Sequence, residues 1–491
     1  MKQATKHNKR NTLYTHLQYG DQTKKDLTLI FSQEISAYYW SKKNKYYHNR
    51  LKKFYQFSVV SGSRVLQIGC HNSYLLDAVK PLYGVGVDSN PDNIVLAKKL
   101  YSKYEFILGI VDDVQVDTPF DYIILSCSTM QLYDVQNFLE RLQRLCHRHT
   151  RIIIDSYSYV WEPILWLAQK CGLRRKTVFK NWVSRADLVN FLYCADFEVV
   201  TQGEFTLLPC YIPLVSMICN AIIARIPGFT RLCLNQWIVA RQDPKVFEPH
   251  KKNVTVSIII PCKNEKGNIE AAVKSCPNMG ARTDLIFIDG HSVDGTLQEI
   301  ERVARKYPEK AIRFCVQDGS GKGDAVRKGF DMAHGDVLMI QDGDLTTPPQ
   351  ELTKFFKALV SGKGEFINGS RLVYGMESEA MRFLNLLANF FFSALFSWTL
   401  NQKVKDTLCG TKVLWKKDYK LIADNRSFFG NFDPFGDFDL LFGAAKLQLK
   451  ILDMPVHYKR RQYGKTQIRR FYHGLILLYM SFVALRKFKL Y

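Results

Sequence analysis

Short runs of apolar and β-branched residues alternate with stretches of helical periodicity through the first half of the chain. The apolar runs lie at residues 63–73, 84–88, 120–125 and 151–155. The helical stretches lie at residues 46–60, 91–101 and 135–146. Strands that alternate with helices usually return to one sheet in the same direction, so this pattern predicts a parallel, doubly wound α/β sheet.

The same alternation begins again after a polar stretch that contains prolines. Apolar runs at residues 254–261, 284–288 and 337–340 each end in polar or glycine-rich residues. The pattern therefore predicts a second doubly wound α/β domain. The predicted division is a basic arm at 1–44, a first domain at 45–242, a linker at 243–253, a second domain at 254–455 and a basic, amphipathic, membrane-associating segment at 456–491.

The chain is strongly basic, with a formal net charge of +22 over 491 residues. This charge favours polyanionic partners, which include nucleic acid, anionic lipids and phosphorylated substrates. The sequence shows no aromatic-and-basic recognition module and no paired spacing of zinc ligands, so we expect no nucleic-acid partner. The 12 cysteines are scattered, and no apolar leader follows the basic N-terminus, so we expect a cytoplasmic protein with reduced thiols.

Two uncharged segments, 205–224 and 383–402, each reach the 20 residues of a membrane span. Pro209 and Pro213 weaken that interpretation for the first segment, because each removes a helical hydrogen bond. In the second segment, asparagines and serines form a polar stripe opposite Phe390. We therefore expect peripheral attachment at the cytoplasmic face of the membrane, and a buried core helix is the alternative for the second segment.

Asp342 and Asp344 follow the apolar run 337–340 and flank a glycine. A period of two places both carboxylates on one side of an extended segment, at the strand end where open α/β sheets bind ligands. Such a pair suits a hard divalent ion, Mg²⁺ or Mn²⁺, that is shared with a diphosphate. A solvated Asp-Gly turn is the alternative interpretation of this short motif.

Further motifs stand in a fixed order around the acidic pair. They are Asn264-Glu265 after a strand, residues 289–296 (DGHSVDGT) and the glycine-rich loop 318–329. In this order they resemble glycosyltransferase family 2, which has the GT-A fold, and above all its polyprenyl-phosphate sugar synthases. The resemblance implies a nucleotide-sugar donor and a lipid-phosphate or glycan acceptor. It assigns the nucleotide sugar to Pro261, Asn264, Glu265, Asp289, Lys322, Gly323 and Asp342, and the metal to Asp342 and Asp344.

The resemblance continues beyond the acidic pair. Residues 368–371 (NGSR) and 406–412 (DTLCGTK) match later motifs of the family, and the first match implies a catalytic role for Arg371. Asp437 and Asp439 lie where the family carries an acidic pair beside the acceptor, and Asp437 is the preferred candidate. The alternative is that both aspartates are charges at a helix N-terminus.

The C-terminal basic stretch contains Arg461 and Lys465 in an R-x-x-x-K pattern around Gly464. We expect these side chains to close over the donor diphosphate, because guanidinium and ammonium groups pair with phosphate oxygens. The same basic clusters also suit anionic lipid headgroups.

The first domain resembles class I methyltransferases that use S-adenosylmethionine. Gly69 after the first strand and Asp88 after the second match the positions that contact this cofactor. His71 and Ser73 stand where the family carries glycines, and Gln67 and Ile110 stand where it carries acidic residues. Side chains in the turn narrow the approach of the ligand, so we expect S-adenosylmethionine to bind weakly or not at all.

These patterns predict an inverting, metal-dependent glycosyltransferase with an altered methyltransferase-like domain. The expected reaction moves a sugar from a nucleotide-diphosphate donor to a polyprenyl phosphate, or to a related lipid or glycan acceptor, at the cytoplasmic membrane face. The alternative is a bifunctional protein that both methylates and glycosylates one cell-surface glycan.

Overall fold

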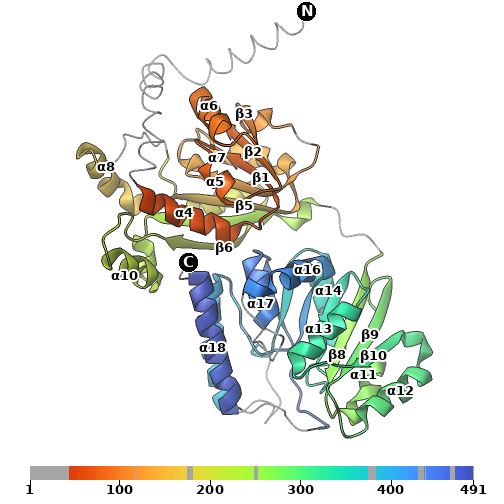
Figure 1. The fold of residues 1–491 in the computed structure, drawn as a ribbon. Helices are drawn as coiled ribbons and strands as arrows, with labels where there is room; N and C mark the ends of the chain where they lie inside the picture. Colours follow the sequence, from red (N-terminus) through yellow and green to blue (C-terminus); the bar gives the residue numbers. More distant parts are fainter. Residues whose placement is uncertain are drawn as a thin grey trace, which may run out of the picture.

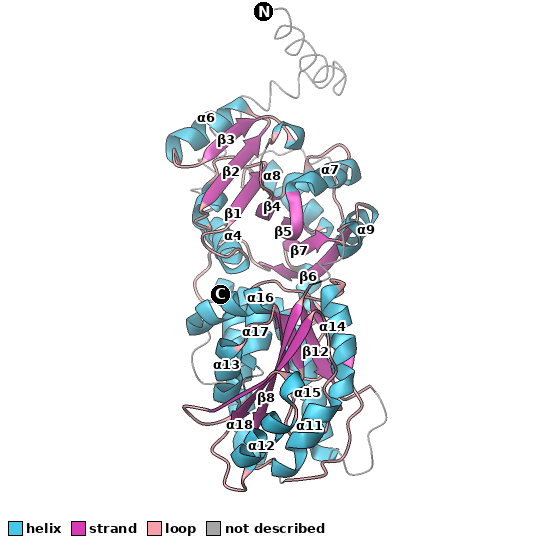
Figure 2. Cartoon of the chain, turned by 90° about the vertical axis from the view of Figure 1, so that its right-hand side faces the viewer, coloured by secondary structure: helices cyan, strands magenta, loops and turns pink. Residues whose placement is uncertain are grey.

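The computed structural model describes residues 44–115, 117–173, 181–247, 253–373, 383–428, 436, 438–464 and 470–489. Within these residues the chain forms two seven-stranded sheets, one in each half of the sequence, and helices cover both faces of each sheet (Figures 1 and 2). The prediction of two α/β domains with doubly wound, mainly parallel sheets is confirmed.

The first sheet has the strand order β3-β2-β1-β4-β5-β7-β6. Strands β1 to β5 are parallel, whereas β7 runs antiparallel between β5 and β6. The strands are β1 (Arg64–Ile68), β2 (Tyr83–Asp88), β3 (Glu105–Leu108), β4 (Phe120–Ser126), β5 (Cys146–Tyr157), β6 (Phe197–Phe205) and β7 (Asn235–Gln242). The helices are α4 (Lys45–Ser58), α5 (Tyr74–Ala78), α6 (Pro91–Leu100), α7 (Val135–Leu142), α8 (Glu162–Lys170), α9 (Arg185–Cys194) and α10 (Val215–Ala221).

The second sheet has the order β10-β9-β8-β11-β13-β12-β14. Strands β10, β9, β8 and β11 are parallel, and β13 runs antiparallel to both of its neighbours. The strands are β8 (Thr255–Cys262), β9 (Arg282–Asp289), β10 (Ile312–Val316), β11 (Val337–Ile340), β12 (Phe366–Ser370), β13 (Lys412–Trp415) and β14 (Ile451–Pro455). The helices are α11 (Ile269–Ser275), α12 (Thr296–Lys306), α13 (Lys322–Met332), α14 (Leu352–Val360), α15 (Phe383–Leu400), α16 (Lys416–Asp424), α17 (Phe438–Lys446) and α18 (Arg470–Lys489).

The apolar runs become central strands because both faces of each sheet are covered. On β8, Ile259 packs into one core, whereas Ile258 and Ile260 pack into the core on the opposite face. This alternation follows from the two-residue period of a strand. Helices α13, α15, α17 and α18 contribute to the first of these cores, and α11, α12 and α14 contribute to the second.

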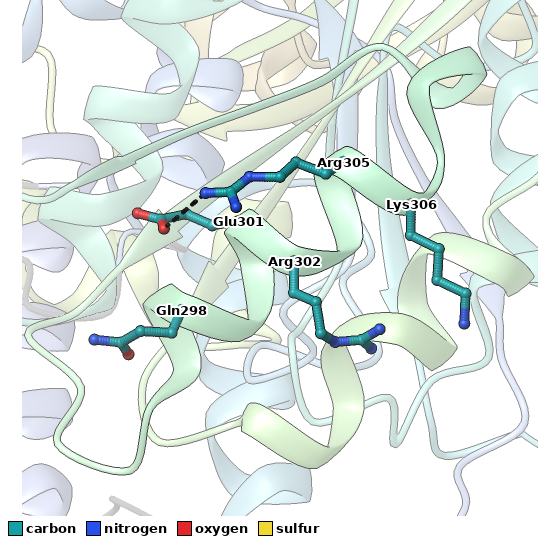
Figure 3. A pocket seen from close by; sticks show the side chains of 5 residues that line it. All are labelled: Gln298, Glu301, Arg302, Arg305 and Lys306. Carbon is teal, nitrogen blue, oxygen red and sulfur yellow. Dashed lines mark ion pairs between the residues drawn. The ribbon is translucent and has the colours of Figure 1, made fainter.

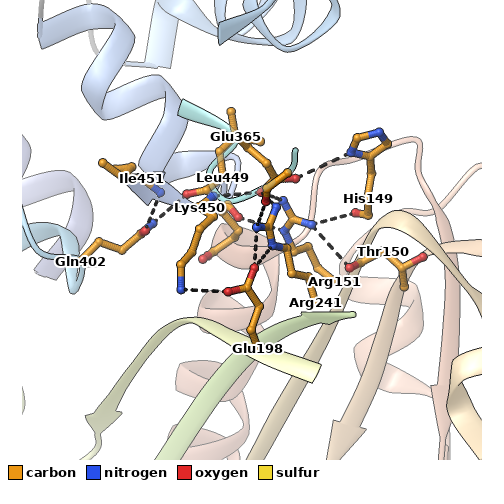
Figure 4. Close-up of polar contacts among 12 residues, drawn as sticks. His149, Thr150, Arg151, Glu198, Arg241, Glu365, Gln402, Leu449, Lys450 and Ile451 are labelled. Carbon is orange, nitrogen blue, oxygen red and sulfur yellow. Dashed lines mark hydrogen bonds and ion pairs between the residues drawn. The ribbon is translucent and has the colours of Figure 1, made fainter. Parts of the chain in front are cut away.

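A buried ion cluster joins the two domains (Figure 4). Glu365, directly before β12, lies 2.6 Å from Arg151 Nη2 of β5 and 3.2 Å from Arg241 Nη1 of β7. All three side chains are at most 5% exposed. Burial opposes ionisation of Glu365, but the two arginines outweigh it and hold the pKa of this carboxyl well below its ordinary value. The domains therefore share a charged contact that neither could satisfy alone.

Candidate functional site

Acidic and polar side chains gather at the carboxyl ends of β8, β9 and β11. Glu265 follows β8, Asp289 ends β9, and Asp344 follows β11. The register of the parallel strands brings the ends of β8 and β9 side by side, because Cys262 at the end of β8 pairs with Asp289 at the end of β9. Arg461 joins two of the ends, since Nη1 lies 2.9 Å from Glu265 Oε1 and Nη2 lies 2.5 Å from Asp344 Oδ2. Glu265, Asp289 and Asp344 thus follow or end neighbouring strands at one edge of the sheet.

Asn264 shapes the turn after β8. Its backbone N–H donates to Ser292 Oγ at 2.8 Å, and its side-chain oxygen accepts from the Val293 N–H at 2.9 Å. Asn264 adopts a φ of 57°, in the left-handed region that asparagine tolerates better than most residues. Asn264 thus ties the turn after β8 to the D-G-x-S-x-D-G-T turn after β9. Its backbone N–H and its side-chain oxygen are both used in this structural link. Pro261 lies within β8, next to this turn.

Glu265 has a distinctive electrostatic setting. Its carboxylate is 8% exposed and also accepts a hydrogen bond of 2.6 Å from Asn268 Nδ2. Burial raises the pKa of Glu265 to about 7, although the nearby guanidinium of Arg461 acts in the opposite direction. A carboxylate held in this way can accept hydrogen bonds from a nucleoside.

The acidic pair is matched by basic side chains. Lys322, the first residue of α13, places Nζ 2.7 Å from Asp342 Oδ1. Burial opposes the charge on Asp342, but Lys322 outweighs it, so the pKa of Asp342 is lowered. Asp344 Oδ1 accepts hydrogen bonds from the backbone and hydroxyl of Thr346 at 3.1 and 2.9 Å. Each aspartate is therefore fixed with one carboxylate oxygen toward a cation.

Glycines allow this region to close tightly. Gly321, which precedes α13, has a φ of 86°, and Gly436 packs against Gly323 so closely that a Cβ on Gly436 would lie 2.6 Å from the Gly323 Cα. A Cβ on Gly410 would overlap both the Asp342 carboxylate and Lys322 Nζ. The D-T-x-C-G-x-K motif therefore needs its glycine to lie against the acidic pair.

The C-terminal loop contacts the turns at this sheet edge through several side chains. Besides the two ion pairs of Arg461, Tyr463 Oη lies 3.3 Å from Asp294 Oδ2, and Lys459 N–H donates to Thr346 O at 2.8 Å. These contacts attach the loop to the turns after β9 and β11. Lys465 lies outside the described residues.

Arg371 is held by a partner that the motif comparison did not single out. Its Nε and Nη2 lie 2.7 and 2.9 Å from the two oxygens of Asp406, which is fully buried. Asn389 of α15 donates to the same carboxylate at 2.9 Å. Asp406 and Asn389 thus orient the guanidinium. A polar residue inside an apolar helix, as at Asn389, is the sequence signal that could have indicated this role.

Asp439 lies in the first turn of α17 and is 9% exposed. Its Oδ2 lies 2.7 Å from Arg426 Nε, so its charge is already compensated. This geometry matches the alternative interpretation of a charge at a helix N-terminus. Asp437 lies outside the described residues.

The polar stripe of α15 points inward. Ser393 and Ser397 donate to Val404 O at 2.6 and 3.1 Å, and Asn389 is 1% exposed. Phe390 and Phe391, in contrast, are 54% and 57% exposed. The stripe does lie opposite Phe390 as predicted, but it serves internal hydrogen bonds instead of facing water.

The acidic pair fits a hard divalent ion only if a ligand supplies further oxygens. Across the described ranges no group of three or more His, Cys, Asp or Glu side chains is placed to hold a metal. Asp342 and Asp344 offer two carboxylates beside the cations that would neutralise phosphates. A donor set of this kind matches an ion whose other ligands are diphosphate oxygens and water.

Asp88 and the turn after β1 are hydrogen-bonded to each other in the first domain. Asp88 accepts hydrogen bonds from the His71 N–H at 2.8 Å, the Asn90 N–H at 3.0 Å and Asn93 Nδ2 at 3.1 Å. His71 and Ser73 have φ values of 47° and 56°, so they occupy conformations that favour glycine. The carboxylate expected to bind a ribose is therefore already engaged.

The remaining positions of this region that differ from the family, Gln67 and Ile110, offer no carboxylate to a ligand. Gln67 is 2% exposed, and its Oε1 accepts a hydrogen bond from the Leu76 N–H at 3.1 Å. Ser128 Oγ lies 2.6 Å from the point where a Cβ on Gly69 would be. Ile110 is 52% exposed and offers no polar side-chain atom.

We expect calorimetric titration of the full chain with S-adenosylmethionine to show no micromolar binding. Two missing hydrogen bonds to charged groups, at about 1.5 to 3 kcal/mol each, weaken binding by roughly 100-fold or more. S-adenosylhomocysteine serves as the matched second ligand, because it shares the adenosine and lacks the sulfonium charge. Micromolar binding of either ligand would show that the turn after β1 admits the cofactor.

A separate pocket of about 450 Å³ lies on the outer side of α12 (Figure 3). Arg305 extends toward Glu301 and pairs with it at 3.7 Å, whereas Gln298, Arg302 and Lys306 point in other directions. Arg302 and Lys306 both pair with Glu270 of α11. These exposed charges are satisfied on the surface of the helix pair, and we assign no ligand to them.

The fold and site together define an α/β domain that presents acidic and basic side chains at the carboxyl edge of a parallel sheet. Residues 257–420 match the family model described as Glycosyl transferase family 2, and residues 60–197 match one described as Methyltransferase domain. The chain thus joins a family 2 glycosyltransferase domain to a domain of the methyltransferase type, which confirms both resemblances.

Individual relatives match parts of the chain. A dolichol-phosphate mannosyltransferase of Pyrococcus furiosus is 35% identical over 134 residues, which cover 27% of this chain and 37% of that protein. An undecaprenyl-phosphate 4-deoxy-4-formamido-L-arabinose transferase of Proteus mirabilis is 29% identical over 111 residues, which cover 22% and 34%. The chain therefore spans well under half the length of these relatives.

A solved structure similar to the chain is glucosyl-3-phosphoglycerate synthase from Mycobacterium tuberculosis in complex with Mn²⁺, uridine diphosphate and glucosyl-3-phosphoglycerate. It is 18% identical, with a TM-score of 0.35, and the match covers 48% of this chain and 80% of that chain.

Proposed function

We propose that the protein transfers a sugar from a nucleotide-diphosphate donor to a polyprenyl phosphate, or to a related lipid or glycan acceptor. The observation that carries this proposal is the meeting of Glu265, Asp344 and Arg461, beside the Asp342–Lys322 pair, at one sheet edge. The names of the Pyrococcus and Proteus relatives support a polyprenyl-phosphate acceptor. The linker at 243–253, between the end of β7 and the start of β8, would join the two domains.

In the proposed reaction, an acceptor oxygen forms a bond to the anomeric carbon of the sugar while the bond from that carbon to the donor phosphate breaks. The departing nucleoside diphosphate gains negative charge. Lys322 and Arg461 would compensate this charge, and such compensation is usually the largest contribution to this kind of catalysis. A divalent ion on Asp342 and Asp344 would supply further Lewis-acid stabilisation when bound.

The acceptor is proposed to be a phosphate because, of the two aspartates predicted beside the acceptor, the one that the structure describes is engaged in an ion pair. Asp439 pairs with Arg426, so it would have to leave that ion pair before it could accept a proton. A phosphate oxygen is already anionic and needs little such help. Arg371, which is fixed by Asp406, supplies a guanidinium that suits an acceptor phosphate.

None of the helices in the described ranges is both long enough and apolar enough to cross a membrane. We propose that the protein binds peripherally to the cytoplasmic face through α15 and α18. Phe391 of α15, together with Leu475 and Phe482 of α18, is more than half exposed, and exposed aromatic side chains of this kind insert into lipid headgroup regions.

We expect nucleoside diphosphates to raise the thermal unfolding midpoint of the full chain when Mn²⁺ is present, and EDTA to reduce this shift. A ligand at 100 times its dissociation constant stabilises the native state by about 2.7 kcal/mol. Inorganic phosphate with Mn²⁺ is the control for nonspecific binding to the basic surface. Absence of a shift with every common nucleoside diphosphate would contradict the proposed donor.

A further inference from the structure

Helix α10, in the methyltransferase-type domain, turns its polar side chains inward and its apolar side chains outward. Ser216 and Asn220 are 1% exposed, whereas Val215, Met217 and Ile218 are 46%, 61% and 44% exposed. A helix on a soluble domain normally turns its apolar face to the core. Here the polar side chains face inward and the apolar side chains face outward, so the outer face requires another explanation.

The inward polar residues of α10 are fully used. Asn220 Oδ1 accepts hydrogen bonds from the N–H groups of Leu207 and Leu208 at 2.7 and 3.0 Å, and Asn220 Nδ2 donates to Tyr46 Oη at 3.0 Å. Ser216 Oγ donates to Cys210 O at 2.8 Å. These bonds fix the rotation of α10, so the exposure of its apolar face is a built feature of the domain.

The exposed face extends onto the neighbouring helix α8. Ile164, Trp166 and Leu167 of α8 are each more than half exposed. Trp161, which directly precedes α8, donates from Nε1 to Leu232 O at 2.7 Å and so ties α8 to the segment that follows α10. Lys170 Nζ lies 3.7 Å from the centre of the Trp166 ring. A tryptophan beside a lysine is the pairing typical of membrane interfaces.

The same face continues into the glycosyltransferase domain. Trp398 of α15 donates from Nε1 to Arg225 O, just after α10, at 3.1 Å. Lys489 of α18 in turn donates to Asn401 Oδ1, just after α15, at 2.6 Å. Figure 1 shows α8, α10 and α18 along one side of the molecule. Apolar surfaces of both domains therefore lie on one side and are linked by direct contacts.

The charge of these elements favours an anionic partner. Residues 205–234, which contain α10, include the exposed Arg231 and no Asp or Glu, whereas Arg225 is buried. Helix α18 contains the exposed Arg486 and the half-buried Lys487 and no acidic residue, whereas Lys489 is buried. Helix α8 carries one exposed acid, Glu162, beside Lys170 at its other end. An apolar surface on which α10 and α18 contribute basic and no acidic side chains matches a bilayer that carries anionic headgroups.

We propose that α8 and α10 form the second half of a lipid-docking face, so that the methyltransferase-type domain holds the glycosyltransferase domain against an anionic bilayer. The purpose of this face rests on the proposed transfer to a membrane-borne acceptor. Two separated anchoring regions fix the orientation of the protein, whereas α15 and α18 alone would allow it to tilt. The first domain then acts as a membrane-positioning module.

The test compares the full chain with the double variant Met217→Glu/Ile218→Glu in flotation with vesicles of phosphatidylcholine and phosphatidylglycerol. We expect the variant to partition at least about tenfold more weakly, because two apolar side chains lose lipid burial. The matched control is Leu82→Glu/Val95→Glu, which places the same charges on exposed positions of the same domain, 83% and 66% exposed, outside α8 and α10. This control should bind like the unaltered protein.

The outcomes separate this inference from the proposed function. Unchanged donor binding and unchanged transfer to a detergent-solubilised acceptor in the double variant, together with weaker flotation, would support lipid docking. Flotation equal to that of the unaltered protein would overturn it. A shift from dimer to monomer without lipid would also overturn it, because the face would then bind a second copy. Failure of sugar transfer in the unaltered protein as well as in both variants would refute the proposed function. The flotation result would still test lipid docking.

Discussion

Replacement of Asp342 by asparagine is expected to lower sugar transfer by about 1,000-fold, the upper range for loss of one key electrostatic group. Asparagine keeps the shape of the side chain but removes the charge that faces Lys322 at 2.7 Å and that would bind the metal. Asp344, the second proposed ligand, would then have to hold the ion with a single carboxylate that also contacts Thr346 and Arg461. The rate of labelled sugar transfer measures the effect.

The matched control is Asp424→Asn, which makes the same change at an exposed position near the end of α16. Its transfer rate should equal that of the unaltered protein. The Asp342→Asn variant should also keep its thermal unfolding midpoint within a few degrees, since its loss concerns the ligand and not the core. Transfer at a normal rate in a metal-replete buffer would remove the assignment of Asp342 as a metal ligand.

Replacement of Glu365 by alanine is expected to lower the free energy of unfolding by about 3 to 5 kcal/mol, because removal of one partner leaves buried charges uncompensated. Arg151 would then lose its ion-pair partner while remaining buried, whereas Arg241 would keep its contact with Glu198, where Nε lies 2.6 Å from Oε1. The depressed pKa of Glu365 gives the pH dependence a definite sign. Its contribution is complete above 4.5, the ordinary pKa of a glutamate, and is lost as the pH falls below that value.

Chemical denaturation at neutral and acidic pH measures this effect. Glu301→Ala is the control, because it removes a 41% exposed carboxylate from a surface ion pair with Arg305, for which about 0 to 1 kcal/mol is expected. A loss in Glu365→Ala no larger than in Glu301→Ala would show that the interdomain cluster contributes little to stability. A loss that persists undiminished at low pH would contradict the ionised state of Glu365.

The fold could be predicted because its strands are buried on both faces. Runs such as those that became β8 and β11 are almost wholly apolar, and their ends carry Glu265 and Asp342 directly. Parallel strands bring such ends to one edge, so the order of motifs sufficed to predict that these residues lie at the same sheet edge. The bridge that Arg461 forms between Glu265 and Asp344 was not predicted.

The interdomain cluster could not be predicted, because its partners are far apart in the chain. Arg151 and Glu365 are 214 residues apart, and each stands at the edge of an apolar run, where a charged residue usually faces water. The orientation of α15 was equally hidden. Periodicity identifies a polar stripe, but only the position of Asp406 shows that Asn389 faces inward.

Incubation of the purified protein with labelled nucleotide sugars, Mn²⁺ and detergent-solubilised polyprenyl phosphate tests the central claim most directly. We predict a labelled lipid product with at least one donor, absent when EDTA is added and absent with Asp342→Asn. Parallel reactions with methyl-labelled S-adenosylmethionine should yield no labelled product. Methyl transfer to the lipid, without sugar transfer from any donor in the panel, would contradict the account.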